Sequence, residues 1–163
     1  MSISSIKAGK IICELSGWDT STLRLQKLLY IAHMFYAGEK RKRLINEDFE
    51  AWKRGPVEPD LYRYCRGYGA DPIPNIFPVD DVDESRQEYQ YLKYVVENTQ
   101  GRVLGTKRIS LGALLDYTHW EKGAWKAAYD KELDKWYRDT PIISFESIVK
   151  EYDDRKAEGQ FAT

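Results

Sequence analysis

Few side chains in this sequence stand in an arrangement that could catalyse a reaction, and the two histidines are the first to consider. Asp116 and His119 are three residues apart, so one face of a helix could hold them as a carboxylate–imidazole pair that moves a proton. No serine or cysteine in a recognisable nucleophile setting accompanies this pair, which favours a structural hydrogen bond. His33 falls inside a strongly apolar helical stretch, which favours a packed histidine over a catalytic one.

Metal and phosphate sites have equally weak support. Asp80, Asp81, Asp83 and Glu84 are bunched together, but they lack the alternate spacing and the glycine of a calcium-binding loop. The glycines form neither a dinucleotide-binding motif nor a phosphate-binding loop. We therefore predict no metal, no cofactor and no catalytic residue, and we expect the protein not to be an enzyme.

The two cysteines, Cys13 and Cys65, lie far apart and form no CxxC motif. This spacing disfavours a zinc module or a disulfide framework and fits a reducing compartment. No apolar run approaches the roughly 20 residues that span a bilayer, and residues 1–9 lack the apolar centre of a secretion signal. We therefore expect a soluble, cytoplasmic protein without membrane contact.

The basic run Lys40-Arg41-Lys42-Arg43 could contact the phosphate groups of a nucleic acid. The chain as a whole carries a net charge of −1 and has a pI of about 6.2, so it has no global attraction for nucleic acid. A solvated helix end or a protein-docking patch is the favoured interpretation. A nucleic-acid-binding regulator of its own operon remains the alternative.

The elements that must position these residues are predicted to be mostly helical. A length of 163 residues, with 42% hydrophobic and 31% charged residues, indicates one globular domain of ordinary size. Expected helices cover residues 3–15, 22–37, 59–68, 84–99, 110–118, 124–136 and 144–152. Their apolar positions repeat at helical spacing, and Ser110 and Ser144 stand where N-caps are expected.

One short stretch departs from this helical period. From Leu44 the apolar spacing becomes strand-like, and Gly55-Pro56 ends the stretch, which predicts a small β-ribbon near residues 44–57. The predicted fold class is therefore mainly α: a compact domain of about six or seven helices with this ribbon. It is expected to occupy residues 1–152, followed by a polar C-terminal tail at 153–163 that frays.

Several segments together resemble the SocA-like antitoxin family, also called the Panacea domain. The first is the LQKLLY sequence of residues 25–30, and the second is Glu50-Ala51-Trp52 leading into Gly55-Pro56-Val57. The resemblance runs from about Ile6 to Tyr152, and its two main motifs are specific as a pair. The remaining matching positions are Pro59, Tyr62, Leu115, Thr118, His119, Ala124 and Trp125.

The resemblance implies an antitoxin of a bacterial or phage toxin–antitoxin pair. Members of this family neutralise a toxin by binding it, and the founding member is described as an adaptor that delivers its toxin to a ClpXP-type protease. Partner toxins in the family are diverse, so the resemblance does not identify the toxin. An enzyme would instead need convergent polar groups in a deep pocket around His119.

The shared motif residues are expected to maintain the fold, while other surface residues select the toxin. Gly55 is predicted to adopt a backbone conformation that other residues reach with difficulty, and Pro56 to fix the turn. The predicted toxin-binding residues are Trp52, Arg54, Val57 and Tyr62, because exposed aromatic and arginine side chains anchor many interfaces. The expected structural motif residues are Leu25, Gln26, Lys27, Leu28, Leu29, Tyr30, Trp52, Gly55, Pro56, Pro59, Thr118, His119 and Trp125.

Overall fold

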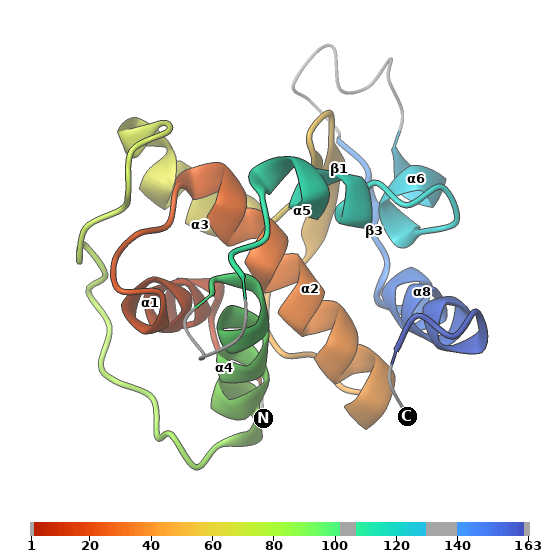
Figure 1. Ribbon diagram of the computed structural model, residues 1–163, viewed down its shortest axis with the longest axis horizontal. Coiled ribbons are helices and arrows are strands. Elements are labelled where there is room, and N and C mark those ends of the chain that lie inside the picture. Colours follow the sequence, from red (N-terminus) through yellow and green to blue (C-terminus); the bar gives the residue numbers. More distant parts are fainter. Residues whose placement is uncertain (1, 102–106, 130–139, 162–163) are drawn as a thin grey trace.

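The computed structural model describes residues 2–101, 107–129 and 140–161, and a single helix runs through its centre (Figure 1). This helix, α2 (Thr22–Lys40), is buried on nearly every face. A helix that is apolar on all sides needs neighbours all round. Those neighbours are α1 (Ser5–Leu15), α3 (Pro59–Cys65), α4 (Gln87–Thr99), α5 (Leu111–Thr118) and α8 (Phe145–Ala157).

Serine side chains begin four of these helices. The hydroxyl oxygens of Ser110 and Ser144, the two N-caps predicted from the sequence, each accept a hydrogen bond from the backbone N–H three residues further on. Ser4 and Ser21 do the same for α1 and α2. Each cap satisfies one of the N–H groups that a helix start leaves without a partner.

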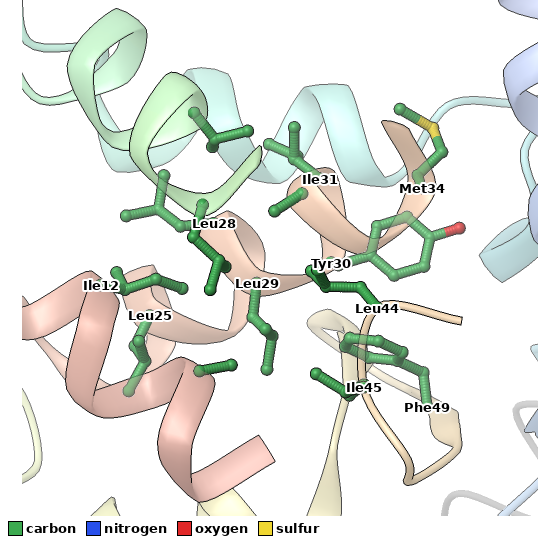
Figure 2. Close-up of a cluster of buried hydrophobic side chains, with 14 of the residues drawn as sticks. Ile12, Leu25, Leu28, Leu29, Tyr30, Ile31, Met34, Leu44, Ile45 and Phe49 are labelled. Atoms are coloured by element: carbon green, nitrogen blue, oxygen red, sulfur yellow. The ribbon is translucent and has the colours of Figure 1, made fainter. Parts of the chain in front are cut away.

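The core forms where α2 meets α1 and the segment that leads into the sheet (Figure 2). Leu25, Leu28 and Leu29 are fully buried, as the helical spacing of the LQKLLY motif predicts. Tyr30 packs edge-to-face on Phe49, with ring centroids 5.2 Å apart. Truncating one of these leucines to alanine removes buried carbon and leaves a cavity, which costs about 2–5 kcal/mol.

The small sheet has three antiparallel strands in the order β2-β1-β3. Strand β1 (Phe49–Trp52) pairs with β2 (Gly55–Val57) as a hairpin, with Ala51 opposite Pro56. The expected β-ribbon is thus confirmed, although regular pairing begins at Phe49 and not at Leu44. The third strand, β3 (Ile142–Ile143), pairs with β1 and was not expected, because two residues carry no periodic pattern.

Several expected boundaries were wrong. Helix α2 continues through Gly38 to Lys40, because this glycine has a packing role: a Cβ atom there would lie 1.9 Å from Cγ of Tyr152. Helix α8 continues to Ala157 with Arg155 buried, so the tail does not fray from Asp153. Helix α4 begins at Gln87, after the expected residue 84.

Two shorter helices complete the description. The turn η1 (Arg66–Tyr68) extends α3 as a single 3-10 turn, within the helix expected at residues 59–68. Helix α6 (Ala124–Ala128) begins where the sixth helix was expected. The rest of that prediction, as far as Trp136, lies largely outside the described residues. The expected class, mainly α with a small sheet, is confirmed.

Candidate functional site

The polar residues of the family motifs are bonded to the protein's own backbone. Gln26 on α2 forms two hydrogen bonds with Glu58, which follows β2. The Glu58 N–H donates to Oε1 of Gln26 at 2.7 Å, and Nε2 of Gln26 donates to the Glu58 carbonyl at 3.1 Å. The side-chain amide therefore pairs with the backbone as a neighbouring strand would, and it fixes the sheet against the central helix.

Lys27 is the most unusual member of this set, since its side chain is fully buried. Its Nζ atom donates to the carbonyl oxygen of Pro56 at 2.8 Å. Burial lowers the pKa of Lys27 to about 7, because the charged form loses its hydration. This bond holds strand β2, which contains Pro56, against the central helix α2.

Gly55 makes room for this contact. Its φ angle is +108°, which side-chain-bearing residues rarely adopt, so the predicted backbone conformation is confirmed. A Cβ atom at this position would lie 2.8 Å from Nζ of Lys27 and 3.1 Å from Cε1 of His119. The backbone therefore favours glycine strongly, and a side chain here would also have to displace the Lys27 amine from its place beside Gly55.

His119 makes structural contacts and does not pair with Asp116. Its Nδ1 atom lies 2.6 Å from the Leu115 carbonyl oxygen, and Nε2 lies 3.3 Å from the carbonyl oxygen of Lys53. Its ring packs against Trp125 with centroids 4.1 Å apart. With both ring nitrogens against the backbone, the acid–base pair that the spacing allowed is not formed.

The neighbouring motif residues act in the same way. Nε1 of Trp125 donates to the Trp52 carbonyl at 2.6 Å, which ties α6 to the sheet. The Thr118 hydroxyl donates to the Leu114 carbonyl within α5. His33 is also buried and accepts a bond from the Ile45 N–H at 3.4 Å, which agrees with the packed interpretation.

A buried polar cluster that the sequence did not reveal links α2 to α8. Oε1 of Glu151 accepts from the Tyr30 hydroxyl at 2.7 Å and from the Ala124 N–H at 2.9 Å. Oε2 accepts from Nε of Arg155 at 2.8 Å, and the guanidinium lies over the rings of Tyr117 and Trp120. The only sequence signal was a Glu–Arg pair one helical turn apart, which is usually a surface feature.

Among the predicted toxin-binding residues, three reach the surface together. The ring of Trp52 packs edge-to-face against that of Tyr62 at a centroid distance of 4.8 Å, and both side chains are half-buried. Arg54, in the turn beside them, is exposed. Val57 is only 3% exposed, so a partner cannot touch it in this conformation. We call Trp52, Arg54 and Tyr62 the ribbon surface.

A second surface feature was not predicted at all. A groove of about 930 Å³ lies over the C-terminal half of α2, between α4 and α8. Its walls are rich in aromatic side chains that come from four separate segments, which is why no local pattern indicated it. We call it the aromatic groove; its lining includes Phe35, Tyr91, Tyr94, Tyr117, Tyr152 and Phe161.

Opposite walls of the aromatic groove are joined through one carboxylate. The Tyr91 hydroxyl on α4 donates to Oε1 of Glu39 at 2.6 Å, and the Tyr152 hydroxyl on α8 donates to Oε2 at 3.2 Å. Burial and these bonds to a carboxylate raise the pKa of both tyrosines. The hydroxyl groups of both tyrosines are therefore already bonded to Glu39, while their rings line the groove.

Metal and thiol chemistry finds no support in the described part of the chain. No group of three or more potential metal ligands is present among those residues. Cys13 and Cys65 are free and buried, and burial raises their pKa to about 12 and about 11. A thiol that stays protonated at neutral pH is a poor nucleophile.

In the described part of the chain, no helix is long and apolar enough to cross a membrane.

In the described residues, the motif side chains are thus bonded to the backbone of the helical domain. Aromatic side chains reach its surface at two places, the ribbon surface and the aromatic groove. The chain belongs to the SocA-like antitoxin family, since the family model "Antitoxin SocA-like, Panacea domain" matches residues 25–126. The resemblance noted in the sequence is thereby confirmed.

A curated relative also matches part of the chain. Antitoxin SocA of Caulobacter vibrioides is 49% identical to the chain over 55 residues, which make up 34% of this chain and 29% of the relative. The match therefore spans less than a third of the relative's length. A search of solved structures finds no match.

Proposed function

We propose that this protein neutralises a cognate toxin by binding it directly. Membership of an antitoxin family supports this role. The observation that carries the proposal is the use of the motif side chains: Gln26, Lys27 and His119 all contact backbone groups of this chain. Side chains engaged in this way are unavailable to a substrate. We therefore infer that the protein acts by recognising a partner with its surface.

The ribbon surface is the contact that the sequence itself suggested. Arg54 is exposed there beside the Trp52–Tyr62 pair, and arginine, tryptophan and tyrosine are the residues enriched in binding hot spots. A stable complex buries roughly 1,200–2,000 Å² in total. The toxin contact must therefore extend well beyond these three residues.

We extend the proposal to delivery of the toxin to a ClpXP-type protease, on the strength of the family resemblance. An adaptor differs from a simple inhibitor in one measurable way, since it shortens the lifetime of the toxin. Toxin half-life in cells with and without this protein, and with and without the protease, distinguishes the two. An unchanged half-life would restrict the function to inhibition by binding.

The antitoxin unit is proposed to extend beyond the matched residues 25–126. Helices α1 and α8 lie outside that match on opposite sides, and both pack on the central helix α2. The buried bond from Tyr30 to Glu151 joins the matched part to α8. We therefore place the functional unit from α1 to the end of α8.

Pairing within the basic run weakens the nucleic-acid alternative. Both Nη atoms of Arg41 donate to the Asp153 carboxylate, and Arg43 is bonded to Asp48. Two of the four cations are therefore already neutralised by neighbours, and phosphate contacts would have to compete with these pairs. Strong retention on DNA that falls steeply with salt would restore the alternative.

Co-expression tests the proposed function. The protein is produced together with the toxin encoded beside its gene, and growth and co-purification are measured. We expect growth to recover and the two proteins to elute together. The variant Leu28→Ala, which weakens the core, is the control that shows how a loss of folded protein affects growth and co-purification. Failure of the wild-type protein to protect against the neighbouring toxin, and against a panel of toxins, would refute the antitoxin function.

A further inference from the structure

The central helix α2 is covered along only part of its length. Helix α5 lies over it between α4 and α8 and ends at Thr118 (Figure 1). Beyond that end, Phe35, Gly38 and Glu39 of α2 form part of the aromatic groove, with α4 and α8 as its walls. Among the described residues, no helix continues the cover, so this part of a helix otherwise enclosed on all sides faces a groove.

The groove already holds one aromatic side chain that arrives from outside the helices. Phe161 lies after the end of α8, and its ring stacks on Tyr152 at a centroid distance of 5.0 Å. The same ring lies 4.8 Å from that of Phe35. Its segment shows which ligand the groove accepts: an apolar ring presented by a chain without regular structure.

We propose that the aromatic groove is a docking site for a segment of the toxin, which inserts a large aromatic or aliphatic side chain where Phe161 lies in the free protein. This inference rests on the proposed function and adds a second contact to the ribbon surface. Phe161 acts as a placeholder that covers apolar surface until the partner arrives, because contiguous exposed apolar patches invite nonspecific association.

The size and the lining of the groove fit such a segment. A volume of about 930 Å³ is near the upper end of the roughly 300–1,000 Å³ that ligand pockets occupy. Tyr94 on α4 is 60% exposed at the rim, which leaves a ring free to cover an inserted side chain. Recognition of side chains presented by one segment in a hydrophobic groove is a common mode of peptide binding.

The charged groups of the groove balance one another and set no requirement for a charged partner. Arg41 is paired with Asp153, and Glu39 accepts from two tyrosines, so these groups are already satisfied. Lys156 is exposed and forms no ion pair within the described residues. The lining thus holds two cations and two carboxylates, Arg41 and Lys156 against Glu39 and Asp153, and this balance suits an uncharged apolar side chain.

Displacement of Phe161 has a thermodynamic consequence. When a site is free in only a fraction of the molecules, the apparent affinity falls by that fraction. Removing the placeholder therefore increases the affinity for the toxin. Removing a rim residue that contacts the toxin does the opposite, and this pair of opposite effects distinguishes a docking groove from a stretch of ordinary surface.

The test uses the full chain and the toxin encoded beside its gene, in a form silenced at its active site. Affinity is measured by titration for the wild type, Tyr94→Ala, Tyr94→Phe and Phe161→Ala. We expect Tyr94→Ala to weaken binding about tenfold or more, Tyr94→Phe to retain it, and Phe161→Ala to strengthen it a few-fold. Tyr64→Ala is the matched control, an exposed tyrosine on α3 outside the groove.

Circular dichroism melting confirms that each variant is folded. Unchanged affinity of folded Tyr94→Ala, or weaker binding by Phe161→Ala, would overturn the groove proposal while the wild type still binds and the proposed function stands. A wild-type dimer that Tyr94→Ala abolishes would also overturn it, because the groove would then hold a second copy of this chain. If the wild type binds no toxin at all, the proposed function itself fails.

Discussion

The Arg155 guanidinium donates to the Glu151 carboxylate one turn away on α8, and both side chains are almost completely buried, at 2% and 1% exposed. On the same helix, Lys150 and Asp154 form a pair with the same spacing, but Lys150 is 74% exposed. The two pairs have similar chemistry in opposite surroundings. Comparing the two pairs therefore shows, within one helix, how burial changes the contribution of an ion pair to stability.

Glu151→Gln is expected to destabilise the protein by about 3–5 kcal/mol, because it leaves the Arg155 charge buried without a counter-charge. Lys150→Met is the matched control and should change the free energy of unfolding by less than about 1 kcal/mol, as exposed pairs contribute little. Chemical denaturation of both variants measures the difference. Equal effects would mean that the buried cluster does not hold α8 on α2.

Lys27→Met should change how stability depends on pH. The pKa of Lys27 is about 7 in the folded protein, against 10.5 for an ordinary lysine. Between these values the unfolded chain binds more protons than the folded one, so the wild-type free energy of unfolding rises with pH. The rise is up to about 1.4 kcal/mol per pH unit. Below pH 7 the destabilisation that comes from burying the charged Lys27 amine is present in full.

The difference between wild type and Lys27→Met isolates this effect from other titrating groups. Urea denaturation of both proteins at several values between pH 7 and 9.5 provides it. We expect the wild type to gain on the variant as the pH rises. A constant difference over this range would show that Lys27 keeps an ordinary pKa in the folded protein.

Gly55→Val should destabilise the protein by on the order of 1–3 kcal/mol. The φ angle of +108° is unfavourable for valine, and the added carbons would collide with Lys27 and His119. Gly112→Ala in α5 is the control, since a Cβ atom there meets nothing closer than 3.9 Å. That change should be neutral or stabilising by up to about 1 kcal/mol. Equal melting temperatures for Gly55→Val and wild type would contradict the prediction.

His119→Ala is expected to lower stability and leave toxin neutralisation intact, because its ring nitrogens face backbone carbonyls and its ring packs on Trp125. Growth rescue and toxin affinity of the variant are both measured at a temperature below its melting temperature, and the two results are compared. A folded variant that keeps full toxin binding and yet loses protection would point to a chemical role for the imidazole.

Replacing Arg54 and Tyr62 together with alanine should weaken toxin binding by at least tenfold without unfolding the protein, since both lie on the ribbon surface. Tyr62 also packs on Trp52, so Tyr62→Phe serves as a control that keeps the ring. If the folded double variant neutralises the toxin at equal dose, the interface lies elsewhere on the molecule.

Local patterns were sufficient to predict the helices and the hairpin. The spacing of Leu25, Leu28 and Leu29 predicted the buried stripe of α2, and the change of period predicted the ribbon near Phe49. The special backbone of Gly55 was predicted correctly, but the turn expected at Gly55-Pro56 lies at Lys53-Arg54, and Gly55 and Pro56 both belong to strand β2. Such features depend on neighbours in sequence, which one chain displays fully.

Features that depend on distant neighbours could not be predicted in this way. Gly38 looked like a helix stop, yet its meaning comes from Tyr152, more than a hundred residues later. Glu151 and Arg155 looked like surface charges, because nothing local says that Tyr30 and Tyr117 will enclose them. The aromatic groove likewise needs four segments to be folded before it exists.

The bond between Tyr30 and Glu151 spans 121 positions of the chain, and the ribosome makes its two ends at very different times. Before α8 has left the exit tunnel, one side of α2 has no partner. This side includes the Tyr30 hydroxyl and the space beside Gly38 that Tyr152 fills in the folded protein. Non-local closure of this kind is slow compared with the formation of single helices. We therefore expect newly made molecules to pass through an unprotected interval, in which degradation of the incomplete fold sets how much working protein accumulates.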